Sequence, residues 1–195
     1  MVSHRKGVAT LNLLKTPPGT LQWPTYVDAP LHFKGVPTNL YKATLRLTPE
    51  EATPIIAVID AQTDKAFAAA QTNPRYANQQ LVRRVTYGRS KDTVWVQFQA
   101  QEPPLLFDAK GDRIEKPTPV GDGARVSIGY ALVPMAAVRK SLFGTDPRYS
   151  FEREDGVEVG VRLHLAAVQL LPPVPVPPAP QREDRRRLRS LPMES

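Results

Sequence analysis

Four segments of this chain alternate apolar and polar residues with a period of two, and this pattern restricts the fold more than any other feature. The alternation runs over residues 39–47, 93–100, 124–133 and 157–171. Because successive side chains of a β-strand point to opposite faces, each segment predicts a strand with one buried and one exposed face. In the last segment, valine or leucine occupies every second position up to Leu165. The pattern predicts a mainly β protein.

One α-helix is predicted between the first two of these segments. Thr48 can cap the helix, Pro49 suits its first turn, and Glu51 completes a capping box. The residues that follow, up to about Gln71, place large apolar side chains near one helical face: Ile55, Ile56, Ile59, Phe67 and Ala70.

The 21 prolines of the chain favour loops, edge strands and linkers over a compact helical protein. A first strand is expected at residues 20–26, where Pro24 indicates an edge or bulged strand. Residues 73–92 are predicted to form a loop, and residues 135–155 a long loop with a short helical turn. Residues 107–112 resemble a hairpin turn in which a glycine supplies the positive φ angle. Five or six strands and one helix predict an OB-type five-stranded barrel with one inserted α-helix and long loops.

The composition divides the chain into four parts. Residues 1–18 are expected to be a flexible arm, and residues 19–171 the barrel domain. Residues 172–180 are mostly proline and form an extended, semi-rigid linker. Residues 181–195 carry five arginines against three acidic residues and are expected to be a basic disordered tail.

A formal net charge of +7 favours a polyanionic partner, either nucleic acid or an anionic membrane. The absence of cysteine excludes disulfide bonds and thiolate zinc sites. No apolar run reaches transmembrane length, and the first residues do not resemble a signal peptide. We expect a soluble, cytoplasmic protein with no membrane partner.

No arrangement of residues needed for catalysis is evident, so we do not expect an enzyme. The three histidines are scattered, and neither a phosphate-binding loop nor an HExxH motif is present. Asp60 and Asp64 are one helical turn apart and could share a metal, but such a pair more often lies on a solvated helix face. Asp108 and Asp112 flank a glycine without the carboxylate count of a calcium loop. We therefore predict neither a metal nor a cofactor.

The functional prediction rests on the polar faces of the predicted strands, opposite their apolar faces. If the apolar residues line a barrel interior, the outward set is Lys42, Thr44, Arg46, Trp95, Gln97, Gln99, Arg125, Ser127, Arg162 and His164. Cations can follow the phosphates of a single strand, and an aromatic face can stack on an unpaired base. Alternatively, a helix or loop covers the side of the strand that carries Trp95.

Three further aromatic residues are candidates for base stacking. Trp23 and Tyr26 lie on the first predicted strand and could equally belong to the core. Tyr87 lies in a basic stretch and is either a nucleic-acid contact or one packed tyrosine in a solubilising loop. The DNA-binding set that we predict is Trp23, Tyr26, Lys42, Arg46, Arg83, Arg84, Tyr87, Arg89, Trp95, Gln97, Arg125 and Arg162.

Residues 19 to about 170 resemble the single-stranded-DNA-binding replication proteins of tailed bacteriophages, an OB-fold family. Four stretches carry the likeness by their order and spacing: GTLQWP at residues 19–24, LYKATL at 40–45, PLLFDAKG at 104–111, and GVEVGVRL at 156–163, running on to Gln169. The resemblance implies a protein that coats transient single strands during replication, recombination and repair. It also implies a homodimer, as in many members, and contacts with a replicative DNA polymerase or helicase.

One departure from the family concerns the end of the chain. Related proteins commonly end in an acidic tail that recruits partners and competes with DNA, whereas residues 181–195 are net basic here. Two other functions remain open from the sequence. One is an RNA-binding or RNA-chaperone barrel, which uses the same surface physics. The other is a structural or assembly protein that docks a partner through residues 172–180.

Overall fold

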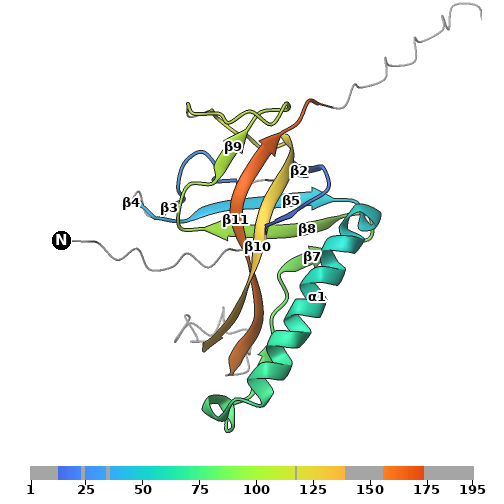
Figure 1. Ribbon diagram of the computed structural model, residues 1–195, viewed down its shortest axis with the longest axis vertical. Helices are drawn as coiled ribbons and strands as arrows, with labels where there is room; N and C mark the ends of the chain where they lie inside the picture. The colour runs from blue at the N-terminus through green and yellow to red at the C-terminus, as the bar shows by residue number, and fades with distance from the viewer. Residues whose placement is uncertain (1–12, 23–24, 34–35, 117, 139–155, 174–195) are drawn as a thin grey trace, which may run out of the picture.

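The computed structural model describes residues 13–22, 25–33, 36–116, 118–138 and 156–173, and these form a mainly β protein with one long helix (Figure 1). The elements are β1 (Leu14–Lys15), β2 (Gly19–Leu21), β3 (His32–Phe33), β4 (Val36–Pro37), β5 (Tyr41–Leu47), α1 (Pro49–Gln71), the 3-10 helix η1 (Pro74–Tyr76), β6 (Leu81–Arg83), β7 (Tyr87–Arg89), β8 (Val94–Ala100), β9 (Leu105–Phe107), β10 (Arg125–Val138) and β11 (Val157–Leu170).

Five of these strands close into a barrel. β2 pairs with β5, β5 with β8, β8 with β11, β11 with β10, and β10 returns to β2. All of these pairs are antiparallel except β8 with β11. This closed ring confirms the predicted OB-type barrel, in which α1 is inserted between the second and third barrel strands.

The barrel interior is filled by the apolar positions of the alternating segments. Val94, Val96 and Phe98 of β8 are fully buried, as their parity predicts. The Phe98 ring meets the ring of Tyr130 edge to face, with 5.3 Å between centroids. Buried aromatic pairs in this geometry contribute about 0.5–1.5 kcal/mol beyond their area. The same burial raises the pKa of the Tyr130 hydroxyl.

Helix α1 begins at the predicted capping box. The Glu51 backbone N–H donates to Thr48 Oγ1 at 3.3 Å, and the Thr48 backbone N–H donates to Glu51 Oε2 at 2.9 Å. Ile55, Ile56 and Ile59 are buried against the barrel. The helix then continues along β6, β7 and the outer part of β11 (Figure 1).

Strands β10 and β11 are long enough to extend past the barrel toward the C-terminal end of α1 (Figure 1). There Val157 and Val159 are buried together with Ala70, and Phe67, Tyr76 and Leu81 pack around them. Within the barrel, a bulge at Gly129/Tyr130 leaves Ala166 unpaired in β11. The bulge shifts the buried parity of β11 from Leu165 to Val168, which ends the simple alternation.

Four sequence-based expectations about local structure require correction. Residues 73–92 are not an open loop, because they contain η1, β6 and β7. The predicted strand at residues 124–133 continues to Val138, which shortens the predicted loop at residues 135–155, and residues 139–155 lie outside the described residues.

The predicted strand at residues 20–26 is regular only up to Leu21, with a single later bridge at Tyr26. Residues 13–18 of the predicted arm are ordered against the barrel. β1 pairs with β10, and the Ser127 hydroxyl donates to the Thr16 carbonyl oxygen at 2.6 Å. Ser127, expected on the open face, is consequently only 3% exposed.

The turn predicted at residues 107–112 is present. The backbone N–H groups of Lys110 and Asp112 both donate to Asp108 Oδ1 at 2.9 Å, and Gly111 has a φ of 91°. Asp108 therefore organises the turn by accepting hydrogen bonds from its backbone.

Candidate nucleic-acid interface

A continuous row of paired residues crosses the outer face of the barrel. Arg125 of β10 pairs with Thr20 of β2, Thr20 with Arg46 of β5, and Arg46 with Trp95 of β8. Trp95 in turn pairs with Gly88 of β7. Directly opposed residues share a face of the sheet, so this row places two guanidinium groups and an indole on one surface.

Two further rows complete the surface. Thr44 pairs with Gln97 but is itself only 8% exposed, so the expectation that its side chain is open was wrong. One step along, Lys42 pairs with both Tyr26 and Gln99. Gln99 also pairs with His164 of β11, two residues from the exposed Arg162. We call this surface the β5–β8 face; its members are Thr20, Tyr26, Lys42, Thr44, Arg46, Trp95, Gln97, Gln99, Arg125, Arg162 and His164. It brings together seven of the twelve predicted residues.

Trp95 is the most prominent apolar group on the β5–β8 face. Its side chain is 38% exposed, although its neighbours Val94 and Val96 are fully buried. The indole leans on Gly88, where an added Cβ would lie only 1.9 Å from Trp95 Nε1. The described residues therefore leave Trp95 partly uncovered, and glycine on the neighbouring strand supplies the space for the ring.

Two hollows adjoin on this face. The first has a volume of about 240 Å³ and includes Arg84, Thr86, Gly88, Trp95 and Gln97 in its wall. The second has a volume of about 230 Å³ and includes Leu40, Ala100, Glu102 and His164. Both share Gln99 and Arg162, which lie between them. We call them the Trp95 hollow and the His164 hollow.

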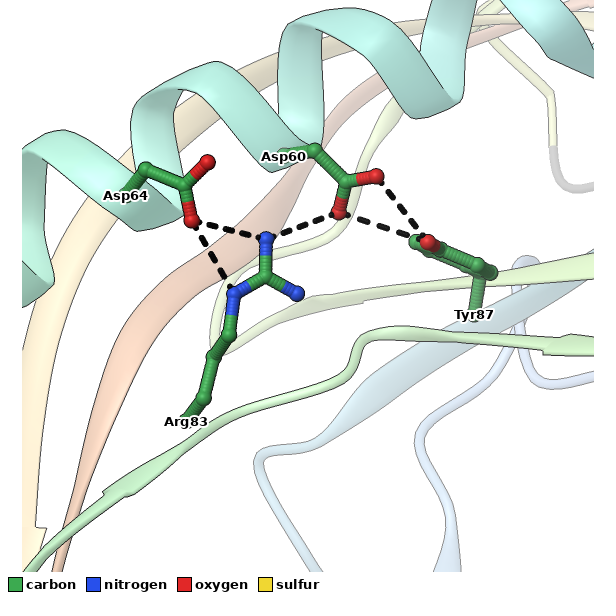
Figure 2. A network of polar contacts seen from close by, with 4 residues as sticks. All are labelled: Asp60, Asp64, Arg83 and Tyr87. Carbon is green, nitrogen blue, oxygen red and sulfur yellow. Dashed lines mark hydrogen bonds and ion pairs between the residues drawn. The ribbon is translucent and has the colours of Figure 1, made fainter.

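Arg83 and Tyr87 are turned toward helix α1. Figure 2 shows Arg83 against Asp60 and Asp64, and Tyr87 against Asp60. Arg83 Nη2 lies 3.0 Å from Asp64 Oδ1 and 3.2 Å from Asp60 Oδ1, and Arg83 Nε donates to Asp64 Oδ1 at 3.1 Å. The Tyr87 hydroxyl donates to Asp60 Oδ2 at 3.1 Å. We call these four residues the helix clamp.

The helix clamp follows from strand parity. Tyr87 pairs with the buried Val96 and Arg83 with the buried Val159, so both point to the face opposite Trp95. Burial and then the hydrogen bond to Asp60 raise the pKa of Tyr87. The hydrogen bond to Asp64 is the main cause that raises the pKa of Arg83. Asp60 and Asp64 serve the helix–strand contact and are more than a solvated helix face.

The remaining predicted residues lie around this surface. Arg84 is in the wall of the Trp95 hollow, and its Nη1 forms an ion pair with Glu158 Oε2 at 3.2 Å. Arg89 is exposed at the end of β7 and pairs with Val94. Trp23 lies outside the described residues.

The cations of the β5–β8 face are not held in ion pairs where the structure describes it. Lys42, Arg46, Arg125 and Arg162 form no ion pair with the carboxylates of the described residues.

Sequence reasoning did not identify the contributions of Gly88, Leu40 and Glu102. The sequence around these three residues gives no local signal, because the contribution of each residue depends on which strand or loop lies next to it in space. The described residues contain no group of three potential metal ligands.

The site is thus an OB-type barrel face that combines exposed and half-buried cations, a partly exposed indole and two small hollows. No family model and no curated protein matches the sequence. Among the described residues, no helix is both long enough and apolar enough to cross a membrane.

Solved structures do match the fold. The chain is similar to gp2.5, a single-stranded DNA binding protein encoded by bacteriophage T7, with a TM-score of 0.59 and 19% identity over 83% of this chain and 87% of that one. It is also similar to the single-stranded DNA-binding protein from bacteriophage Enc34, with a TM-score of 0.54 and 14% identity over 88% and 87% of the chains.

The same Enc34 protein in complex with single-stranded DNA matches with a TM-score of 0.52 and 14% identity, over 81% of this chain and 85% of that one. The structural neighbours are therefore bacteriophage single-stranded-DNA-binding proteins, as the sequence resemblance predicted. At these identities, the likeness establishes a shared fold.

Proposed function

We propose that this protein binds single-stranded DNA without sequence specificity through the β5–β8 face. The observation that carries the proposal is the cross-strand row Arg125–Thr20–Arg46–Trp95, in which cations and a partly exposed indole share one surface. In OB folds, the face of the second and third barrel strands binds oligonucleotides, and β5 and β8 occupy those positions here.

The residues divide into two roles. Lys42, Arg46, Arg125 and Arg162 would neutralise phosphates and release counterions, which gives affinity without sequence information. Trp95 would stack on a base, an interaction worth about 1–3 kcal/mol that tolerates any base. Tyr26, opposite Lys42, is a further candidate for stacking.

The structural neighbours support this assignment by analogy, since their described ligand is single-stranded DNA. Such a protein acts where single strands are exposed, in phage DNA replication, recombination and repair in the cytoplasm of a bacterial host. A replicative polymerase or helicase and a second copy of the chain are the partners that this role suggests.

The test is a titration of tryptophan fluorescence with poly-dT at low and moderate salt, repeated with matched RNA and with duplex DNA. We expect log affinity to fall linearly with log salt and single-stranded DNA to bind more tightly than the duplex. Absence of binding, or binding that ignores salt, would refute the proposal. Tighter binding to RNA would instead identify an RNA-binding barrel, through contacts to the 2′-hydroxyl.

A further inference from the structure

We infer that the Trp95 hollow and the His164 hollow are consecutive nucleotide subsites of one bound strand, and that the second prefers bases with an exocyclic amine. This inference rests on the proposed function and makes it more specific. It assigns one nucleotide of the bound strand to each hollow and states which base the His164 hollow prefers.

The size of the hollows supports a single base in each. Their volumes, about 240 and 230 Å³, lie below the roughly 300–1,000 Å³ of pockets that hold drug-sized ligands. A single nucleobase with part of its sugar is a ligand of the appropriate size class. Two small hollows side by side therefore fit two linked nucleotides better than one large ligand.

Arg162 connects the two hollows. It is exposed, and it lines both hollows together with Gln99. No carboxylate of the described residues forms an ion pair with it. A guanidinium between two base subsites is placed to bind the phosphate that links the two nucleotides, with its planar donors facing the phosphate oxygens.

The Trp95 hollow has the features of a stacking subsite. The indole supplies the apolar surface, and the Gln97 and Gln99 amides lie beside it, joined by a hydrogen bond from Gln99 Nε2 to Gln97 Oε1 at 3.0 Å. Amide groups can both donate to and accept from a base edge, so they favour no single base. In the same wall, Arg84 Nε and Thr86 Oγ1 are buried without a hydrogen-bond partner among the described residues. A bound nucleotide or a bridging water would satisfy such groups after a small adjustment.

The His164 hollow differs in one decisive respect, because Glu102 is in its wall. A carboxylate repels phosphate, so a base is the favoured occupant. A carboxylate also accepts hydrogen bonds but donates none, so it pairs with the exocyclic amino group of cytosine, whereas thymine has a carbonyl oxygen at that position and only its ring N3–H to donate. The expected preference is therefore cytosine over thymine at this subsite.

The linkage of the two subsites can be tested by NMR on the full chain with the dinucleotide dTdC. We expect the Trp95 indole N–H and the backbone amides of Leu40 and Ala100 to shift together, with one dissociation constant. The nucleosides thymidine and deoxycytidine, which carry no phosphate, should shift them more weakly. Shifts confined to one hollow at saturation would overturn the inference.

The base preference can be tested with Glu102→Gln and the hexamers dC6 and dT6, which carry equal charge. We expect the unmodified protein to bind dC6 about threefold more tightly than dT6, a modest effect for an exposed charge-assisted hydrogen bond. Glu102→Gln should bring the two affinities close to equality, because glutamine can donate as well as accept.

Glu115→Gln is the matched control, since it removes the same charge from an exposed position outside both hollows. It should raise both affinities slightly and leave their ratio unchanged. An unchanged ratio in Glu102→Gln would overturn the base preference.

Binding of a twenty-residue dT oligomer distinguishes failure of this inference from failure of the proposed function. If the oligomer does not shift the Trp95 signal, the proposed function fails as well, whereas a shift there without one at Leu40 and Ala100 rejects only the second subsite.

Discussion

At the scale of single residues, Trp95 differs from its neighbours on β8 in what lies across from it. Val94 and Val96 are enclosed by the barrel, whereas the indole of Trp95 rests on Gly88 and is 38% exposed. Burying an indole normally contributes strongly to stability, so one that is left partly open on a basic surface is a candidate for binding rather than folding.

Trp95→Ala should weaken binding of an unstructured oligonucleotide by about 1–3 kcal/mol, because one base loses its stacking partner. Fluorescence anisotropy of a labelled oligonucleotide measures the loss, and thermal unfolding should show the fold retained. If the variant is instead unfolded or strongly destabilised, the indole is a core group and our assignment of faces is reversed.

Gly88→Ala tests the same site without removing the ring. The new Cβ would lie only 1.9 Å from Trp95 Nε1, far inside van der Waals contact, so Trp95 must leave its position and binding should weaken. Gly121→Ala is the control, because a Cβ added at Gly121 would meet open space and should leave the affinity unchanged. Equal affinities for the two variants would show that the position of the indole does not matter.

Tyr87 provides a prediction about pH. Its pKa is raised by burial and by the hydrogen bond to Asp60, so the folded state holds the phenolic proton more tightly than the unfolded chain does. The stabilisation is complete below the ordinary tyrosine pKa of about 10 and is lost as pH rises through the folded-state value.

We therefore expect the free energy of unfolding to fall above about pH 10, and to fall less steeply in Tyr87→Phe. Urea unfolding at a series of pH values measures this slope. The pKa of Tyr130 is also raised, so part of the alkaline sensitivity should remain in Tyr87→Phe. An unchanged slope in Tyr87→Phe would contradict the role of its hydroxyl.

At the scale of elements, the helix clamp fixes β6 and β7 to α1. The Arg83 guanidinium is therefore engaged with α1 and points away from the β5–β8 face. Arg83→Gln should lower stability by about 1 kcal/mol, the upper end for an exposed ion pair, because the guanidinium contacts two carboxylates. Its effect on DNA affinity should be smaller than that of Arg46→Gln, which removes a cation from the β5–β8 face. Urea unfolding and oligonucleotide titration of both variants measure the difference. If Arg83→Gln lost as much affinity as Arg46→Gln with unchanged stability, Arg83 would be a phosphate contact, as the sequence first indicated.

The elements also show which parts of the structure can be predicted from sequence. The faces of β5, β8 and β11 were predictable, because burial of one side of a strand leaves a local period of two. The start of α1 was predictable because Thr48, Pro49 and Glu51 act on one another within one helical turn.

The strands β6 and β7 were missed, since each has only three residues, too few to display a period. The partners of Arg83 were missed for a different reason. Asp60 and Asp64 lie 23 and 19 residues earlier in the chain, and only the packing of α1 brings them close. The basic stretch around Tyr87 therefore had the composition of a nucleic-acid loop but a different arrangement in space.

At the scale of the whole molecule, the pairing of charges differs between the helix clamp and the β5–β8 face. Arg83 is neutralised by Asp60 and Asp64, whereas Arg46, Arg125 and Arg162 form no ion pair with the described carboxylates. These three cations therefore contribute positive potential along the path proposed for the strand. Removing one of these cations should reduce the salt slope of binding by about 0.7, the value for one phosphate contact on a single strand. Arg125→Gln, measured by titration at several salt concentrations, tests this at the far end of the cross-strand row. An unchanged slope would place Arg125 outside the path of the strand.

The basic tail is the last part of the molecule with a predictable contribution to binding. An acidic tail would compete with DNA for the β5–β8 face, so its removal would tighten binding. Residues 181–195 carry five arginines against three acidic residues, and the proline-rich residues 172–180 would let them reach the phosphates of a bound strand.

A truncation after Leu171 should therefore bind DNA with equal or lower affinity than the full chain. Its salt slope should also be shallower, because each lost arginine contact removes counterion release. Titration of both proteins with the same oligonucleotide at several salt concentrations measures affinity and slope together. Tighter binding by the truncated protein would show that the tail obstructs the β5–β8 face despite its charge.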